Sequence, residues 1–262
     1  VATHFEIQGA PSTVELQSGQ NSNVNGLSLI AVDANGTVDR DWRGFGGKAL
    51  LDMGANTDDQ ARSMVTQADG KILITGYTKA QPSPGTGNYF NQLSVRPDYG
   101  IARLNADGSL DTSFGGVDTT NSNLRTGKAL LDLGTNTYDQ AQSIVMQADG
   151  KILIAGYTTA QPTGGTGTHY NYGIVRLNAD GSLDTSFGGI NTSNSNLRTG
   201  KALLDLGTNT TDQAQSIVMQ ADGKILIAGY TTAQPTGGTG TSYNYGIVRL
   251  NADGSLDTSF GG

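Results

Sequence analysis

The 262-residue chain lacks cysteine and has few charged residues. The absence of cysteine excludes disulfide frameworks, cysteine nucleophiles and thiolate metal sites. Charged residues make up 15% of the chain, against roughly a quarter in typical globular proteins. Lys and Arg form no basic run, and the formal net charge is −7. Nucleic acid is therefore not an expected partner.

Long apolar runs and catalytic motifs are missing as well. No apolar stretch approaches the roughly 18 residues of a membrane-spanning helix, so we expect no membrane span, and no targeting leader is recognisable. His4 and His169 are the only histidines, and they show neither a metalloprotease spacing nor a recurring Ser–His–Asp set. The only glutamates, Glu6 and Glu15, lie in the divergent N-terminal part. These absences predict a chain without enzymatic activity and without a cofactor.

Repetition is what the chain has in abundance. Residues 104–176 and 177–249 differ at only five of their 73 positions. A more divergent copy precedes them, because GKALLDMG and ADGKILITGY return later as GKALLDLG and ADGKILIAGY. Self-similarity at a fixed period indicates a repeat architecture, in which the units bury apolar surface against one another. We expect four units, at residues 1–57, 58–137, 138–210 and 211–262.

Each unit contains short apolar segments that predict strands. In the third unit they are rich in Ile, Val and Leu and are bounded by turn residues, at 141–147, 151–158, 172–178 and 201–207. We name these strands a, b, c and d. Asp149-Gly150 joins the first two, and because glycine tolerates the positive φ of a tight hairpin, we expect antiparallel neighbours. Apolar side chains on both alternating faces indicate a sheet that is covered on both sides.

Four antiparallel strands in every unit predict an all-β fold, a β-propeller-like array of four-stranded blades. A β-solenoid is the alternative, although its repeats are usually far shorter and its coils parallel. The first unit is expected to be a divergent cap, with strands at residues 4–8, 13–18, 27–33 and 48–53. The last unit reaches Phe260-Gly261-Gly262 after its third strand. This predicts an open sheet edge that invites closure by the N-terminal segment, continuation of a longer chain or self-association.

The phrase RLNADGSLDTSFGG occurs at residues 103–116, 176–189 and 249–262, and the first two copies are followed by GKALLDLG and MQADGKILIAGY. In this arrangement the chain resembles the delta-60 repeat family of bacterial proteins, over roughly residues 27–262. The resemblance implies a β-propeller-like fold and a secreted or cell-surface location, and it implies no catalytic residue. The units are longer here, with added polar loops such as 117–126 and 159–171.

Two polar segments suggest ligand sites but are better explained as turns and loops. Residues 105–111 carry oxygens at alternate positions, as in a calcium loop, but Arg103 stands where the leading acidic residue is needed. A plain turn explains the same residues, so calcium is possible but not favoured. The glycine-rich segment 163–168 lacks the Lys and the flanking helix of a phosphate loop.

An arginine recurs in the c strands, as Arg103, Arg176 and Arg249. In the neighbouring d strands, Asp132 and Asp205 are expected to lie close to these arginines. We therefore predict cross-strand ion pairs with a structural role.

The two nearly identical units differ most on one expected face. In a blade the b–c and d–a links emerge on the same side, and Tyr138/Thr211 and His169/Ser242 lie in such links. Aromatic planes beside amides and hydroxyls suit glycans or peptides. The alternative is that tyrosine rings cover blade edges and that the loops tolerate change. The candidate ligand-binding residues are Tyr89, Phe90, Tyr138, His169, Tyr170, Tyr172, Tyr243 and Tyr245.

These features predict a non-enzymatic, extracellular or cell-surface repeat module for adhesion or ligand presentation, with a glycan or peptide bound at the loop face. The alternative is a structural subunit that polymerises into a surface filament or matrix fibre through its open C-terminal edge. The neutral surface of Thr, Asn, Gln and Gly suits that alternative as well.

Overall fold

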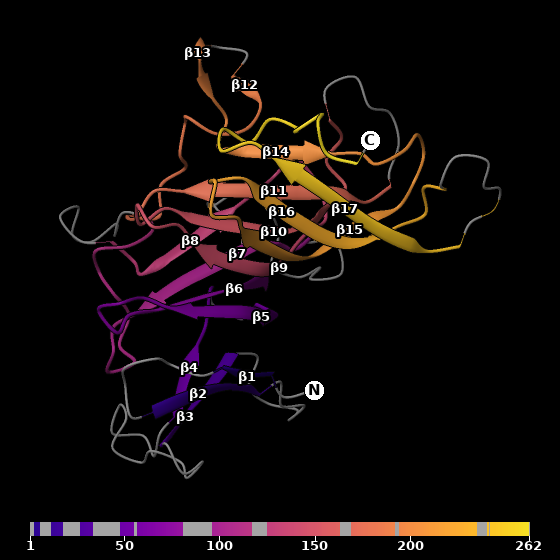
Figure 1. The fold of residues 1–262 in the computed structure, drawn as a ribbon. Helices are drawn as coiled ribbons and strands as arrows, with labels where there is room; N and C mark the ends of the chain where they lie inside the picture. The colour runs from indigo at the N-terminus through magenta and orange to yellow at the C-terminus, as the bar shows by residue number, and fades with distance from the viewer. Residues whose placement is uncertain are drawn as a thin grey trace.

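The sheets of the molecule follow one another in the order of the sequence, and the two termini lie at opposite ends of the row (Figure 1). This computed structural model describes residues 3–5, 12–17, 27–33, 48–54, 57–80, 96–116, 125–162, 169–191, 194–234, 240 and 242–261. Within these ranges the chain forms strands and no helix, so nothing in them resembles a membrane-spanning helix.

Four sheets correspond to the four expected units, and we call them blades 1 to 4. Blade 1 contains β1 (Thr3–Phe5), β2 (Ser12–Gln17), β3 (Leu27–Asp33) and β4 (Lys48–Leu51). Blade 2 contains β5 (Asp59–Thr66), β6 (Ile72–Thr78), β7 (Asp98–Leu104) and β8 (Lys128–Leu131). Blade 3 contains β9 (Asp139–Met146), β10 (Ile152–Thr158), β11 (Asn171–Leu177) and β14 (Lys201–Leu204). Blade 4 contains β15 (Asp212–Met219), β16 (Ile225–Thr231) and β17 (Asn244–Leu250).

One element was not expected from the sequence. Between β11 and β14, β12 (Ile190–Asn191) and β13 (Asn194–Arg198) pair as a two-stranded antiparallel ribbon, where the sequence predicted only a polar loop. The ribbon is separate from the sheet of blade 3.

All strand pairs in the described residues are antiparallel, which confirms the blade prediction and excludes a β-solenoid of parallel coils. In the hairpin between β9 and β10, Gly150 has a φ of 83°, and its N–H donates to Gln147 O at 3.0 Å. This is the positive φ that the Asp-Gly pair predicted.

The fourth strand of blade 3 is shorter than expected, because it ends at Leu204 instead of Gly207. The carboxylate of Asp205 accepts a hydrogen bond from Gly207 N at 3.0 Å and so begins a turn immediately after the strand. Aspartate side chains that bond to the backbone two residues ahead favour turns over ladder pairing.

The prediction of cross-strand ion pairs was wrong. Arg103 Nε donates to Asp111 Oδ2 at 2.7 Å, and the guanidinium lies 4.7 Å from the centre of the Phe114 ring. Asp111 N also donates to Arg103 O, because the chain folds back after β7. Asp132 lies beyond reach, since its neighbour Leu131 is opposite Tyr99 at the other end of the pairing. The other two copies of the pair are Arg176–Asp184 and Arg249–Asp257.

Residues Asn105 to Asp111 form a hydrogen-bonded turn. Gly108 has a φ of 83°, and Asp107 Oδ1 accepts from Ser109 N at 2.9 Å. The carboxylate of Asp107 therefore bonds to the backbone of its own turn, as turn chemistry predicts.

The hydrophobic core lies between the blades. In β10, Ile152 and Ile154 pack in the cluster shared with blade 2, whereas Leu153 and Ala155 pack in the cluster shared with blade 4. Successive side chains of a strand point to opposite faces, so one strand contributes to two cores. The prediction that the sheet is covered on both faces is confirmed for blade 3.

In blades 2 and 3 a tyrosine from the c strand contacts the next blade. Tyr99 OH donates to Gly173 O at 3.0 Å, and Tyr172 OH donates to Gly246 O at 2.9 Å. Both tyrosines are fully buried. Gly173 is required here, because a Cβ at this position would lie 2.9 Å from the Tyr99 hydroxyl oxygen and 2.4 Å from Leu133. Each repeat therefore carries the donor tyrosine and the acceptor glycine side by side, on opposite faces of one strand.

Candidate functional site

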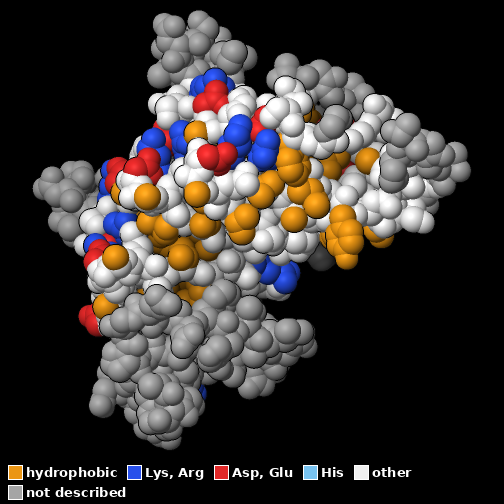
Figure 2. All heavy atoms as spheres, in the orientation of Figure 1, with side chains coloured by type: hydrophobic (Ala, Val, Ile, Leu, Met, Phe, Trp, Pro, Cys, Tyr) orange, Lys and Arg blue, Asp and Glu red, His pale blue; other side chains and the backbone are white. Residues whose placement is uncertain are grey.

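Blade 4 exposes on its outer face the residues that blade 3 buries. Tyr245 is 94% exposed, whereas Tyr172 at the same position of the repeat is fully buried. Ile247 is 57% exposed, and its counterpart Ile174 is buried. Figure 2 shows hydrophobic side chains gathered over this sheet. The other large apolar residues exposed on blade 4 are Val218, Tyr243, Leu256 and Phe260.

The polar groups of this outer face are those that earlier blades use toward their neighbours. Arg176 Nη1 donates to Ala252 O at 2.5 Å, and Gly188 N donates to Asp253 O at 2.9 Å. One repeat later the same donors are Arg249 Nη1 and Gly261 N, and no acceptor for them is found among the described residues. The outer face therefore presents the Tyr245 hydroxyl, the Arg249 guanidinium and the Gly261 amide. The equivalent groups of blade 3 bind blade 4.

The sheet edge at β17 also differs between the described parts of blades 3 and 4. In blade 3, β14 pairs with β11 along the stretch from Tyr172 to Val175. In the described part of blade 4, β17 is the last strand of a three-stranded sheet. Its backbone groups can therefore accept another strand.

A second surface, the loop face, carries a cluster of tyrosines on blade 3. The ring of Tyr170 meets the rings of Tyr138 and Tyr157 edge to face, with centroids 5.9 and 5.1 Å apart. Gln140 joins two of them, because its Nε2 donates to Tyr138 OH at 2.9 Å and its Oε1 accepts from Tyr157 OH. Burial, followed by the neighbouring tyrosines, raises the pKa of Tyr157 to about 12. Tyr157 is thus neutral at physiological pH.

The same cluster is smaller in blade 4. Tyr230 and Tyr243 keep the edge-to-face contact at 5.1 Å, but Thr211 stands where blade 3 has Tyr138. Tyr243 is 67% exposed. The two loop faces therefore differ in aromatic surface although their strands are the same in sequence.

The structure brings together only part of the predicted ligand-binding set. Tyr138 and Tyr170 lie in one cluster, with the exposed His169 next to Tyr170 in the chain. Tyr172 and Tyr245 lie instead on equivalent sheet faces of blades 3 and 4. Tyr172 is buried between these blades, so it is inaccessible to a ligand. Tyr89 and Phe90 lie outside the described residues.

The sequence reasoning missed the outer sheet face of blade 4, although a signal for it was present. Tyr172 and Ile174 are two residues apart, so period-two alternation places them on one face of β11. Shifting both by one repeat gives Tyr245 and Ile247.

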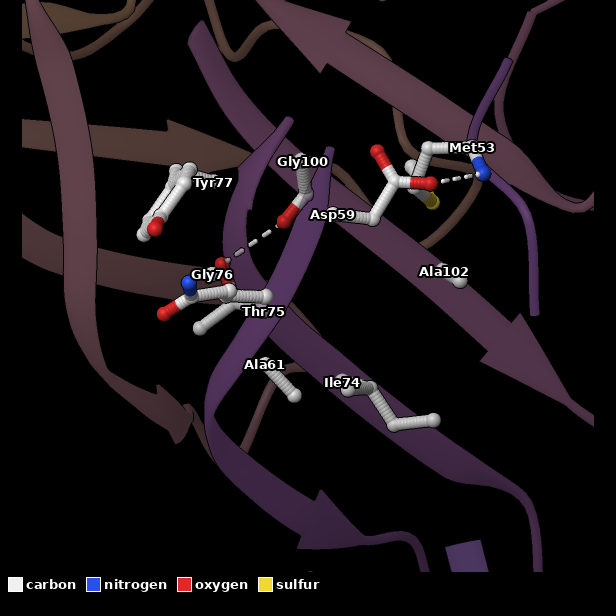
Figure 3. Close-up of a pocket in the computed structure, with 10 residues that line it drawn as sticks. Met53, Asp59, Ala61, Ile74, Thr75, Gly76, Tyr77, Gly100 and Ala102 are labelled. Carbon is white, nitrogen blue, oxygen red and sulfur yellow. Dashed lines mark hydrogen bonds between the residues drawn. The ribbon is translucent and has the colours of Figure 1, made fainter. Parts of the chain in front are cut away.

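A small pocket lies on the face of blade 2 that packs against β4 of blade 1 (Figure 3). Gly76 and Gly100 line it, at the positions that Gly156 and Gly173 hold in blade 3. In blade 3 the hydroxyl of Tyr99 fills this place, 2.7 and 2.9 Å from Cβ atoms built on the two glycines. The pocket is therefore a tyrosine socket.

Blade 1 has no tyrosine to fill the socket. Leu27 is opposite Leu51 in the register that places Tyr99 opposite Leu131, so leucine occupies the tyrosine position. Blade 2 compensates from within: Thr75 Oγ1 donates to Gly100 O at 3.1 Å (Figure 3). Blades 3 and 4 have alanine at the threonine position, where a tyrosine from the preceding blade makes that hydrogen bond.

Comparison with known proteins agrees with this architecture. Residues 67–114, 147–187 and 220–260 match a family model described as a domain of unknown function (DUF5122), beta-propeller. These three segments are β-propeller repeats. Each matched β-propeller segment holds strands b and c of one blade and the turn after them.

No curated protein sequence matches the chain significantly. Among solved structures, Drosophila Plexin A in complex with Semaphorin 1b aligns with 12% identity and a TM-score of 0.39. The alignment covers 97% of this chain and 57% of that chain, so this chain spans little more than half the length of the solved chain.

Proposed function

We propose that this chain is a non-enzymatic β-propeller module that self-associates through blade 4. The observation that carries the proposal is the exposure of Tyr245, 94%, against complete burial of Tyr172 at the same position of a nearly identical repeat. The occupant is a second copy of the chain, because repeat units of this same sequence cover the equivalent faces of blades 2 and 3.

The energetics favour covering this face. Exposed tyrosine, isoleucine and phenylalanine side chains each gain roughly 1.5–3 kcal/mol when fully buried, and contiguous apolar patches mark interaction surfaces. The free edge of β17 adds backbone groups for pairing. A closed pair of molecules uses the two blade 4 faces symmetrically, whereas a filament needs a different second surface on each copy.

Sedimentation velocity over a range of protein concentrations tests the proposal. We expect wild-type association to increase with concentration, and we expect the double variant Tyr245→Ser, Ile247→Ser to remain monomeric. Tyr243→Ser is the matched control, because it removes an exposed tyrosine that packs on Tyr230 in the loop-face cluster. A wild-type chain that stays monomeric, or equal loss of association in the control, would contradict self-association through this face.

Ligand presentation at the loop face is a second candidate function, favoured by the cluster of Tyr138, Tyr157 and Tyr170. This proposal takes a glycan or a peptide as the ligand, since edge-to-face tyrosines beside amides suit both. The test is binding to glycan and peptide arrays by the wild type and by Tyr138→Thr, which reproduces blade 4. Binding that is unchanged in Tyr138→Thr would count against the cluster as the site.

An extracellular or cell-surface location accompanies both proposals. The resemblance to the delta-60 repeats of bacterial proteins and the neutral polar loops support it. Fractionation of the native host, with the chain found in the medium or on the cell surface, is the expected result; recovery from the cytoplasm would overturn it.

A further inference from the structure

Three aspartates meet at the boundary between blades 2 and 3. Asp98 begins β7, Asp132 follows β8 and Asp139 begins β9. One carboxylate oxygen from each lies within 4.8 Å of the others. Asp98 and Asp139 are buried, with 7% and 0% exposure, and Asp132 is half-buried. The three residues come from separate segments, so their meeting is a product of the fold.

Asp139 is fully engaged by hydrogen bonds. Its Oδ1 accepts from Thr158 Oγ1 at 2.5 Å, and its Oδ2 accepts from Leu133 N at 2.8 Å and from Thr137 Oγ1 at 3.1 Å. Asp212 has the same three kinds of donor in blade 4. Asp139 is therefore held in place by the fold, and burial raises the pKa of its carboxyl group.

Asp98 has no such support. Among the described residues, no hydrogen-bond donor bonds to its carboxylate and no Lys or Arg forms an ion pair with it. Burial, followed by the charges of Asp132 and Asp139, raises its pKa to about 7, and Lys201 offsets only part of this. A buried carboxylate that faces two further carboxylates needs a positive partner or a proton.

The two other repeats show what normally occupies this position. Asn171 stands there in blade 3 and Asn244 in blade 4. The side-chain amide of Asn171 donates to Ala160 O at 3.0 Å. Blade 2 has Asp98 at this position instead of asparagine. It therefore lacks the amide donor and carries an acidic group in its place. The companions Asp132 and Asp139 have counterparts in Asp205 and Asp212, so only the first member of the trio differs.

We propose that Asp98, Asp132 and Asp139 bind a calcium ion at the boundary between blades 2 and 3. The donor set consists of carboxylate oxygens, which suit a hard cation and not a metal that prefers nitrogen or sulfur. Calcium tolerates irregular coordination and binds carboxylates through one or both oxygens, whereas magnesium demands a near-ideal octahedron. The site is independent of self-association through blade 4. It joins the start of β7 to the link between β8 and β9 and thereby ties two blades together.

Calorimetric titration of calcium into the full chain, previously stripped with a chelator, tests the site at pH 7.5. We expect one calcium per chain, together with a rise in the thermal midpoint on adding calcium. Asp98→Asn restores the residue found in blades 3 and 4, so it should fold, weaken calcium binding by at least about ten-fold and lose the calcium-dependent rise in midpoint. In the presence of a chelator, this variant should have a higher thermal midpoint than the wild type, because it removes a carboxylate that Asp132 and Asp139 repel.

The chain also offers a test by gain of binding. Asn171→Asp places a third acid beside Asp205 and Asp212, and we expect the stoichiometry to rise from one calcium to two. A wild type that binds no calcium at about 5 mM would overturn the proposal and leave Asp98 as a protonated acid. Equal calcium affinity in Asp98→Asn would place the ion elsewhere and overturn it too. Tighter binding of magnesium in a parallel titration would overturn the choice of calcium.

Discussion

Blades 3 and 4 have nearly the same sequence but different surroundings. Tyr172 and Tyr245 occupy the same position of the repeat, with the same neighbours in the strand, yet one is fully buried and the other is 94% exposed. Blade 4 covers the first of them, and no described residue covers the second. The comparison teaches that in this chain burial is decided by the neighbouring unit and not by the repeat itself.

The largest expected effect separates these two tyrosines. Tyr172→Ala should lower the free energy of unfolding by about 4 kcal/mol, because it empties a core position and leaves Gly246 O without its donor. Tyr245→Ala should change it by less than about 0.5 kcal/mol in dilute solution. Denaturant unfolding of both variants measures the difference. Equal losses would show that the outer face of blade 4 is covered in solution.

Blade 2 should respond to pH differently from blade 3, because Asp98 stands where blade 3 has Asn171. Because the pKa of Asp98 is raised to about 7 in the fold, the native state binds more protons than the unfolded chain between about pH 4 and pH 7. In the presence of a chelator, the free energy of unfolding of the wild type should therefore fall by about 3 kcal/mol relative to Asp98→Asn as the pH rises through this range. Unfolding curves at several pH values check the sign. A difference that does not vary with pH would show that Asp98 titrates normally.

The two c-strand glycines should respond differently to a methyl group. Gly173→Ala should destabilise the chain by about 2 kcal/mol, since the added Cβ meets Leu133 at 2.4 Å and the Tyr99 hydroxyl at 2.9 Å. Gly100→Ala should be nearly neutral, because the nearest atom there is a Thr78 methyl at 3.1 Å and no tyrosine enters the socket. Thermal midpoints of the two variants measure the contrast. A similar loss in both would mean that the blade 2 socket is filled.

The smallest expected effect concerns the threonine of blade 2. Thr75→Ala restores the alanine of the other repeats but leaves Gly100 O without its hydroxyl donor, at a cost of about 1 kcal/mol. Thr75→Val keeps the shape and loses the same bond, so it serves as the control for packing. Denaturant midpoints should fall in both variants. A loss in Thr75→Ala alone would assign the effect to packing.

Much of the fold could be predicted from the sequence, because the alternation of apolar residues and the turn chemistry depend on residues that are close together in the chain. Asp149-Gly150 predicted a hairpin, and its glycine has the required positive φ. Alternating apolar residues in residues 152–155 predicted two buried faces, and both are buried. These features depend on nearest neighbours along the chain, so one sequence suffices.

The errors arose where long-range register decides. Asp132 was expected to pair with Arg103, but the chain folds back after β7 and brings Asp111 to the guanidinium first. Tyr172 was placed on the loop face, although the pleat of β11 directs it into the next blade. The unusual member of the aspartate trio is visible in the sequence, because blade 2 has Asp98 where blade 3 has Asn171. Its convergence with two further carboxylates appears only once the blades are packed.

The tyrosine and its acceptor glycine give the array a direction. Blade 3 donates a tyrosine hydroxyl to blade 4 and accepts one from blade 2, and both halves of the contact lie in the adjacent residues Tyr172 and Gly173. A whole repeat copied into the middle of the series therefore brings its own donor and its own acceptor, and it breaks no contact on either side. Such a chain can lengthen or shorten by complete repeats during evolution without any compensating substitution, while Thr75 allows the series to start at blade 2.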